Sequence, residues 1–325
     1  MTTANRIDVH HHILPSHYVD VVGPTPIGAQ GSSGRVPAWS IAQALDGMER
    51  SGIATAITSV SAPGFAPLEA GATRALARWC NEFAATMVTD YPGRFGMFAA
   101  LPLPGADAAI AEAVYAFDDL HADGVCLLSN YQGRYLGDAR FRPLYEELDR
   151  RHAVVFVHPT SPVNPVSIEA LSLSTLEFTF DTTRAVASLV FSGTLAAFPS
   201  IRWILSHAGG TIPWLAGRID VLSGNNPAVR AMIPDGFTAL MSKMYFDCAL
   251  SANAPQMNLL ARLAGRDRLL FGSDYPFGPK AQMESTAAAI EALRWGRDAK
   301  RALEHENAWR LFPQFRLKSE PSRSP

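Results

Sequence analysis

The stretch Ile-Asp-Val-His-His-His at residues 7–12 predicts a short buried β-strand that ends in three histidines. Successive side chains of a strand point to opposite faces, so His10 and His12 project to one side and His11 projects to the other. Two imidazoles on one face at the end of a strand form half of a metal site. A polar strand end gives the same pattern, so the remaining ligands have to come from elsewhere in the chain.

The composition is that of an ordinary globular protein. Of the 325 residues, 48% are apolar, which is enough for one large α/β barrel or two smaller domains. The 28 basic and 30 acidic residues give a net charge of −2, and no basic stretch is interleaved with aromatics, so we expect no nucleic-acid partner. No apolar run reaches the roughly 18 residues of a membrane span, so we also expect no membrane partner.

The cysteines and the first residues bear on the compartment. Cys80, Cys126 and Cys248 each lie in an apolar segment, which is typical of buried, reduced thiols. The first strand follows so closely on the first residue that no room is left for a signal peptide. We therefore expect a cytoplasmic protein.

Short apolar runs alternate with helical patterns along the whole chain. The predicted strands cover residues 7–12, 54–60, 95–101, 124–128, 153–158, 201–207, 244–250 and 268–274. The predicted helices cover residues 41–50, 69–91, 107–120, 141–151, 181–194, 255–264 and 283–311. Ser40 is the expected cap of the first helix, and Asp181 with the two threonines after it is the expected cap of the fifth.

This alternation predicts a parallel sheet that is covered on both faces. Eight strand–helix units in a chain of this length predict a (β/α)8 TIM barrel, with an open doubly wound sheet as the alternative. No Gly-x-Gly-x-x-Gly turn follows the first strand, which argues against a dinucleotide-binding fold. We expect one barrel domain over residues 1–313, with an insertion loop at 14–38, a second long loop at 159–180 and a flexible tail at 314–325.

Polar residues recur where the predicted strands end. They are His10 and His12 on the first strand, His158 on the fifth, His207 on the sixth and Asp274 on the eighth. The C-terminal ends of barrel strands meet around one mouth, so these side chains are expected to converge. The hypothesis is that His10, His12, His158 and Asp274 bind one divalent metal and leave a position open. His11 is expected to be structural, and the expectation for His17, His121, His152 and His305 is that they are solvated.

Four motifs resemble a known superfamily. They are Asp-Val-His-His-His-Ile-Leu-Pro at 8–15, Val-His-Pro at 157–159, Ser-His-Ala-Gly-Gly at 206–210 and Gly-Ser-Asp-Tyr-Pro-Phe at 272–277. Together they resemble the amidohydrolase superfamily, and within it the metal-dependent decarboxylase branch typified by aminocarboxymuconate-semialdehyde decarboxylase. The stretches 178–185 and 201–207 are most similar to the 6-methylsalicylate decarboxylase type.

The resemblance implies roles for several residues. It makes His10, His12 and His158 metal ligands, Asp274 a further ligand that also carries protons, and His207 the catalytic histidine. It matches Arg218 to an arginine that reaches into a neighbouring subunit's site, which implies a homodimer. The strand at 124–128 has no lysine to bridge a second metal, so one ion is implied, with zinc favoured and manganese as the alternative.

The implied reaction is the non-oxidative decarboxylation of a small hydroxylated aromatic acid. An aryl carbanion is too unstable to form unaided, so the ring carbon is protonated first and carbon dioxide leaves afterwards. The metal acts as a Lewis acid and template. Candidate substrate contacts are Arg184 or Arg218 for the carboxylate, and Phe178, Trp214 and Tyr275 for the ring; surface ion pairs and plain core packing are the alternatives.

A second class of enzyme fits the same ligands. A hydrolase of a lactone or amide would activate water at the metal and use Asp274 as its base. The ligand set does not separate the two classes, because it serves both.

Overall fold

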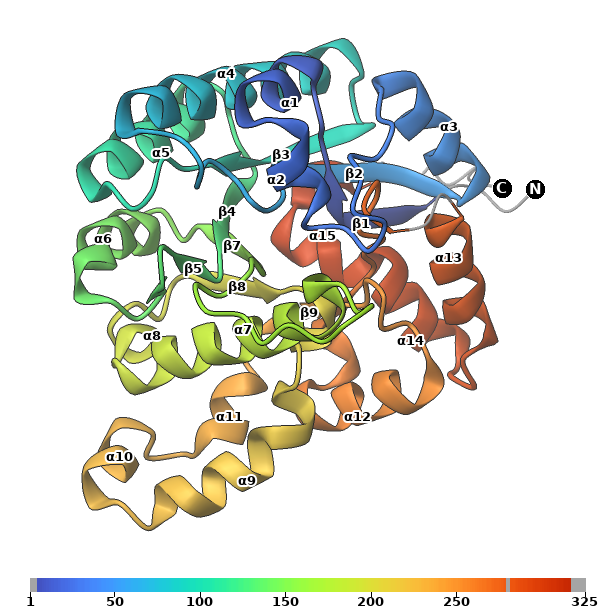
Figure 1. Ribbon diagram of the computed structural model, residues 1–325. Coiled ribbons are helices and arrows are strands. Elements are labelled where there is room, and N and C mark those ends of the chain that lie inside the picture. Colours follow the sequence, from blue (N-terminus) through green and yellow to red (C-terminus); the bar gives the residue numbers. More distant parts are fainter. Residues whose placement is uncertain (1–4, 279–280, 317–325) are drawn as a thin grey trace.

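Eight parallel strands form the centre of the protein and follow one another around it in chain order (Figure 1). The computed structural model describes residues 5–278 and 281–316. The strands of this sheet are β1 (Arg6–His12), β2 (Ile53–Ser59), β3 (Phe95–Ala100), β4 (Gly124–Leu128), β7 (Val154–His158), β8 (Arg202–Leu205), β9 (Tyr245–Asp247) and β10 (Leu269–Leu270). A separate hairpin pairs β5 (Asn130–Tyr131) with β6 (Arg134–Tyr135).

The sheet closes between β1 and the segment that contains and follows β10. The backbone N–H of Val9 donates to the carbonyl of Phe271 at 3.0 Å. The N–H of His12 donates to Tyr275 at 2.7 Å, and the N–H of Asp274 donates to the carbonyl of His10 at 2.8 Å. The predicted (β/α)8 barrel is confirmed and the open sheet is excluded.

The barrel interior is filled by apolar side chains. The inward-facing strand residues are Ile7, Val9, Ile57, Phe98, Cys126, Val154, Phe156, Ile204, Tyr245 and Leu270. The rings of Phe98 and Phe156 stack with their centroids 5.4 Å apart. Because this layer of the interior is apolar, we expect polar chemistry at the mouth, where the strands end.

Helices surround the barrel and form the larger part of the core with its outer face (Figure 1). They are α1 (Ser16–Val22), α2 (Pro24–Gly28), α3 (Ile41–Arg50), α4 (Ala70–Asp90), α5 (Ala106–Asp118), α6 (Arg142–Arg150), α7 (Leu173–Phe191), α8 (Thr194–Ala197), α9 (Ile212–Gly224), α10 (Pro227–Met232), α11 (Phe237–Met241), α12 (Ala254–Ala264), α13 (Gln282–Ala292), α14 (Arg297–Arg301) and α15 (Asn307–Leu311). Short 3-10 or π segments are η1 (Ala139–Phe141), η2 (His207–Gly209), η3 (Arg266–Arg268), η4 (Ala302–Glu306) and η5 (Pro313–Phe315). Ser40 caps α3 as predicted, accepting from the N–H of Gln43 at 3.2 Å.

The predicted bounds of three segments need correction. The long loop expected at 159–180 is shorter, because α7 begins at Leu173. The expected insertion loop at 14–38 contains α1 and α2, and Pro24 opens α2 at a position where its missing N–H has no helical partner to lose. The single helix expected at 283–311 is divided into α13, α14, η4 and α15. The expected flexible tail begins inside η5, and its residues from 317 onward lie outside the described part of the chain.

The prediction that Asp181 caps a helix is wrong. Helix α7 begins at Leu173, and Asp181 lies fully buried in its middle. Its carboxylate accepts from the Ser129 hydroxyl, from Asn130 Nδ2 at 2.8 Å and from the Tyr135 hydroxyl at 2.7 Å. These hydrogen bonds from Ser129, directly after β4, and from the β5–β6 hairpin outweigh the local preference of Asp for a helix end.

Two further expectations concern the cysteines and membrane-spanning helices. Cys80, Cys126 and Cys248 are free and buried, as expected. Among the helices that the structure describes, none combines the length and hydropathy that a membrane crossing requires.

Candidate metal centre

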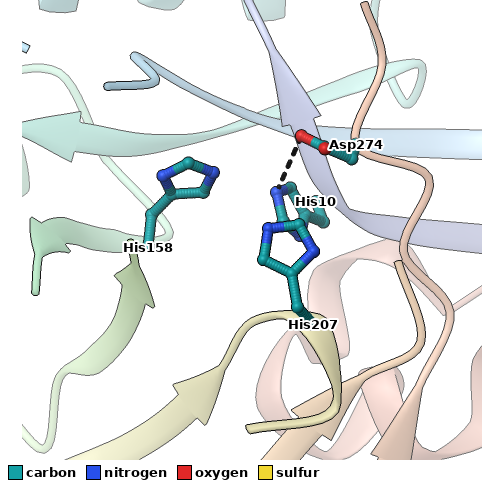
Figure 2. Close-up of side chains that lie close together, drawn as sticks. All are labelled: His10, His158, His207 and Asp274. Carbon is teal, nitrogen blue, oxygen red and sulfur yellow. Dashed lines mark ion pairs between the residues drawn. The ribbon is translucent and has the colours of Figure 1, made fainter. Parts of the chain in front are cut away.

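Four side chains, two from strands and two from the turns that follow strands, point toward one another at the barrel mouth (Figure 2). His10 lies on β1, His158 ends β7, His207 begins η2 two residues after β8 ends, and Asp274 lies four residues beyond β10. All four are buried, and one ligand atom from each lies within 4.8 Å of the others. These groups can hold a metal ion.

His12 belongs to the same cluster. Its Nε2 lies 3.1 Å from the Nε2 of His10, as the alternation of β1 predicts. The Oδ1 of Asp274 lies 3.2 Å from each of these two nitrogens. The structure therefore brings together all five side chains that the sequence placed at the mouth.

The outer nitrogens of the imidazoles are held by second partners. Nδ1 of His158 donates to the carbonyl of Pro159 at 2.8 Å, and Nδ1 of His207 donates to the carbonyl of Ala249 at 3.3 Å. Nδ1 of His12 contacts the hydroxyl of Ser59 at 2.9 Å. A carbonyl only accepts, so His158 and His207 carry their proton on Nδ1 and present a free lone pair on Nε2.

Asp247 is a site residue that the sequence analysis missed. Its Oδ2 lies 2.7 Å from Nδ1 of His10, and its Oδ1 accepts from the N–H groups of His207 and Ala249, each at 2.9 Å. This fully buried carboxylate orients one candidate ligand and fixes the backbone of the candidate catalytic histidine. The available signal was an Asp inside an otherwise apolar predicted strand, because a buried charge needs partners.

Asp8 ties the first strand to the last in a similar way. Its Oδ1 accepts from the N–H of His10 at 3.1 Å and of Ser273 at 3.0 Å. Its Oδ2 accepts from the Ser273 hydroxyl at 2.6 Å and contacts Nδ1 of His11 at 3.1 Å. His11 thus takes part in holding β1 in place, outside the metal cluster, with its ring centroid 4.8 Å from that of Tyr275.

His207 and Asp274 do not continue their strands, contrary to the prediction. β8 ends at Leu205 and β10 at Leu270, and both polar residues lie in turns with positive φ, 50° for His207 and 61° for Asp274. Residues other than glycine rarely adopt this left-handed backbone conformation, and those that do are concentrated at functional sites. Alternation along a strand could not find these directions, because a turn sets them.

The charges of the cluster are strongly coupled. Burial lowers the pKa of His10, but the carboxylates of Asp247 and Asp274 outweigh it and raise that pKa to about 10. Burial lowers the pKa of His12 to about 4, and burial together with the neighbouring imidazoles lowers the pKa values of His158 and His207. Burial raises the pKa of Asp274, but the charge of His10 outweighs it and holds the pKa well below its usual range.

The two neighbouring carboxylates thus favour the protonated form of His10, whereas burial favours the neutral forms of His12, His158 and His207. Nε2 of His158 is buried and has no hydrogen-bond partner among the described residues. A buried imidazole lone pair without a partner is costly unless a cation accepts it. Imidazole and carboxylate are also a donor set that divalent transition metals prefer. The residues fit one such ion.

The candidate substrate contacts are spread more widely. Phe178 lies beside the cluster, with its ring centroid 6.4 Å from that of His158. Arg184 lies instead along α7, with Nη1 3.6 Å from Glu177, and Trp214 is 81% exposed on α9. The sequence analysis missed Phe277, whose ring centroid lies 5.7 Å from that of His12.

The other histidines follow the prediction with one exception. His17, His121 and His152 are exposed. His305 is buried in η4 with its ring centroid 4.5 Å from that of Trp309, so the prediction that it is solvated is wrong. The helical pattern alone did not show which side of this last segment packs on the barrel.

Comparison with known proteins identifies the family. A family model described as Amidohydrolase matches residues 7–314. Decarboxylase yanB of Aspergillus niger is 37% identical over 97% of this chain and 89% of its own length, and the 6-methylsalicylic acid decarboxylase of Penicillium expansum is 35% identical over 96% and 97%. The crystal structure of 5-carboxyvanillate decarboxylase from Novosphingobium aromaticivorans, with manganese and 4-hydroxy-3-methoxy-5-nitrobenzoic acid, covers 95% of this chain and 96% of its own at a TM-score of 0.81 and 20% identity. The chain therefore belongs to the amidohydrolase family, as its motifs predicted.

Proposed function

We propose that the protein is a metal-dependent, non-oxidative decarboxylase of a small hydroxylated aromatic acid. The observation that carries the proposal is the buried convergence of four imidazoles and one carboxylate at the mouth of an amidohydrolase barrel. Relatives that match nearly the whole chain are decarboxylases, including one of 6-methylsalicylic acid. The two products are the corresponding phenol and carbon dioxide.

The proposed ligands are His10, His12, His158 and Asp274, with His207 beside them as the acid–base group. The bound cation would hold the substrate carboxylate and the adjacent phenol oxygen and would withdraw electrons from them. His207 has its Nδ1 proton committed to Ala249, so its Nε2 lone pair is available to take the phenol proton. Asp274 is the proposed proton carrier to the ring carbon that bears the carboxylate. After protonation, cleavage of the carbon–carbon bond returns its electron pair to the ring.

Zinc is the proposed metal, because three imidazoles and one carboxylate form a donor set typical of catalytic zinc sites. Manganese is the alternative, and it is the ion in the 5-carboxyvanillate decarboxylase structure. Metal analysis of the purified protein separates the two. Equal metal content in the His10→Ala/His12→Ala double variant would contradict the ligand assignment.

For the substrate ring we propose Phe178, beside His158, as one wall and Phe277, beside His12, as another. Tyr275 packs on His11 and would act only through it. Arg184 and Trp214 remain proposals for substrate contact, although neither touches the cluster in this protomer.

A homodimer is proposed from the surface of α9. Trp214, Arg218, Val221 and Leu222 follow the i, i+4, i+7, i+8 spacing of one helix face. The apolar three are 81%, 69% and 54% exposed, and α9 projects away from the barrel (Figure 1). A second copy of the chain would cover this face, and Arg218 of each subunit would then reach the metal centre of the other subunit. Sedimentation of the Trp214→Ser/Leu222→Ser variant tests this: a monomer is expected, and an unchanged dimer contradicts it.

One assay separates decarboxylation from the hydrolase alternative. The metal-loaded protein is incubated with a panel of salicylates and a panel of aromatic lactones and amides. Release of carbon dioxide and phenol from the salicylates supports the proposal. Acid release from a lactone or amide without carbon dioxide would contradict it.

We also propose a cytoplasmic location, which the three buried free thiols favour.

A further inference from the structure

A cavity of about 660 Å³ opens at the barrel mouth above β2, β3 and β4. Its floor includes Ala100, Cys126 and Leu128, and its walls include residues 63–70 and 101–105. Cys126 is one of the residues that fill the barrel interior, and Leu128 lies two positions further along the same strand. Leu128 therefore points in the same direction, one layer closer to the mouth.

The cavity lies directly beside the metal centre. Leu128 pairs with His158 across β4 and β7, and Thr160, which also lines the cavity, follows His158 by two residues. On the other flank Val60 lines the cavity, and the hydroxyl of the preceding Ser59 contacts Nδ1 of His12. One half of the mouth thus holds the polar cluster, and the adjacent half holds this cavity.

The buried lining of the cavity is mostly apolar and includes no charged side chain; its buried polar members are Thr73, Asn130 and Thr160. Its buried hydrophobic lining includes Phe65, Leu101 and Leu103 in addition to the floor. The charged residues that line it, Glu69 and Arg74, are exposed and lie at its rim. A second carboxylate of a substrate would find no buried cation in this lining, whereas a hydrocarbon group would be stabilised by leaving water.

The volume exceeds what a one-ring acid needs. A cavity of about 150 Å³ is enough to bind benzene. Pockets of the size seen here take ligands with many more heavy atoms. Because the carboxylate and phenol oxygen have to reach the metal, the space above β2 to β4 is available to a substituent of the ring.

We infer that this cavity binds a hydrocarbon chain, so that the preferred substrate is a hydroxyaryl carboxylic acid with an alkyl chain of several carbons next to the carboxylate. The inference rests on the proposed decarboxylase function and narrows its substrate class. The bond changes are those of the parent reaction: the carbon–carboxyl bond breaks, a carbon–hydrogen bond forms, and the chain is unchanged.

The test compares 2-hydroxybenzoates with hydrogen, methyl, propyl or pentyl at position 6. Each buried methylene stabilises binding by about 0.8 kcal/mol, or about fourfold. Over the four methylenes from methyl to pentyl we expect kcat/KM to rise at least tenfold. Equal or falling values along the series would overturn the inference while leaving the decarboxylase function in place.

A matched pair of variants tests the location. Ala108 lines the cavity from α5, and Ala111 lies exposed on the same helix. Ala108→Phe fills part of the cavity and should reduce the ratio of kcat/KM for the pentyl over the methyl substrate at least fivefold. Ala111→Phe should leave that ratio unchanged. An unchanged ratio in Ala108→Phe places the chain elsewhere and overturns the inference.

Binding of the products separates this inference from the proposed function. The 3-alkylphenols cannot lose carbon dioxide, so calorimetry on the metal-loaded protein measures their dissociation constants without turnover. Tighter binding of 3-pentylphenol than of 3-methylphenol, reduced in Ala108→Phe, supports the cavity assignment even if no acid is decarboxylated. If carbon dioxide is released but the phenols bind equally, only the cavity assignment fails.

Discussion

Replacing Asp247 with Asn changes one atom in the support of the metal centre. In the native protein Oδ1 accepts from the N–H groups of His207 and Ala249, and Oδ2 faces Nδ1 of His10 at 2.7 Å. An asparagine oxygen can keep both backbone hydrogen bonds. Its amide nitrogen then faces Nδ1 of His10, where it can only donate. His10 must move its proton to Nε2, which is the atom that has to bind the metal.

The magnitude follows from the hydrogen bond that is lost. A hydrogen bond to a charged group contributes about 1.5–3 kcal/mol, and 1.4 kcal/mol corresponds to a factor of ten. We therefore expect the metal affinity of Asp247→Asn to fall about 10- to 100-fold, the range typical of a lost partner behind a metal-bound histidine. The backbone bonds remain, so the fold should be retained.

The assay is a competition titration of metal-free protein against a chelating dye. Asp123→Asn is the matched control, because Asp123 accepts a backbone hydrogen bond from Met97 at 2.7 Å but lies at the start of β4, away from the mouth. Its metal affinity should stay within twofold of the wild type. If the metal affinity of Asp247→Asn also stays within twofold of the wild type, the carboxylate of Asp247 does not orient His10 for metal binding.

Three other predictions follow from the same contacts. His207→Asn should keep its metal but lose about 100-fold or more in turnover, measured by metal analysis and carbon dioxide release; loss of the metal would make His207 a ligand. The pKa of His10 is about 10 without metal, so below that pH its imidazole carries an extra proton that must leave when the ion binds. The metal affinity should therefore fall tenfold for each pH unit below about 10. Calorimetry in two buffers at neutral pH should find about one proton released, and none would contradict the assignment. Asn81→Ala removes both side-chain partners of the Ala100 backbone, at 2.8 and 3.0 Å, and should lower the free energy of unfolding in urea by about 3 kcal/mol, whereas a change under 1 kcal/mol would contradict that role.

Much of the architecture was predictable because hydrophobic periodicity carries it. Apolar runs separated by amphipathic segments predict both the eight strands and their parallel order. Alternation in β1 also separates His10 and His12 from His11 correctly. The boundaries of β9 and β10 were predicted too long, because apolar residues continue into turns whose backbone pattern the composition does not reveal.

The support of the site was harder to predict. Asp247 and Asp8 act through hydrogen bonds to residues more than two hundred positions away in the chain, and no local pattern reports such partners. Asp181 shows the opposite error, because its local preference for a helix end is overridden by donors from the β5–β6 hairpin. Side-chain type at strand ends predicted which groups meet, but turn geometry determined how they face one another.

The most direct test of the metal-dependent decarboxylase is one isotope experiment. Protein stripped of metal and reconstituted with zinc or manganese is incubated in D₂O with 6-methylsalicylate labelled with ¹³C in the carboxyl group. We expect labelled bicarbonate and 3-methylphenol with one deuterium at the carbon that carried the carboxylate, and neither product from the His10→Ala/His12→Ala variant. Labelled bicarbonate at equal rates from that variant or from the metal-free protein would contradict the account, as would an intact substrate in the reconstituted enzyme.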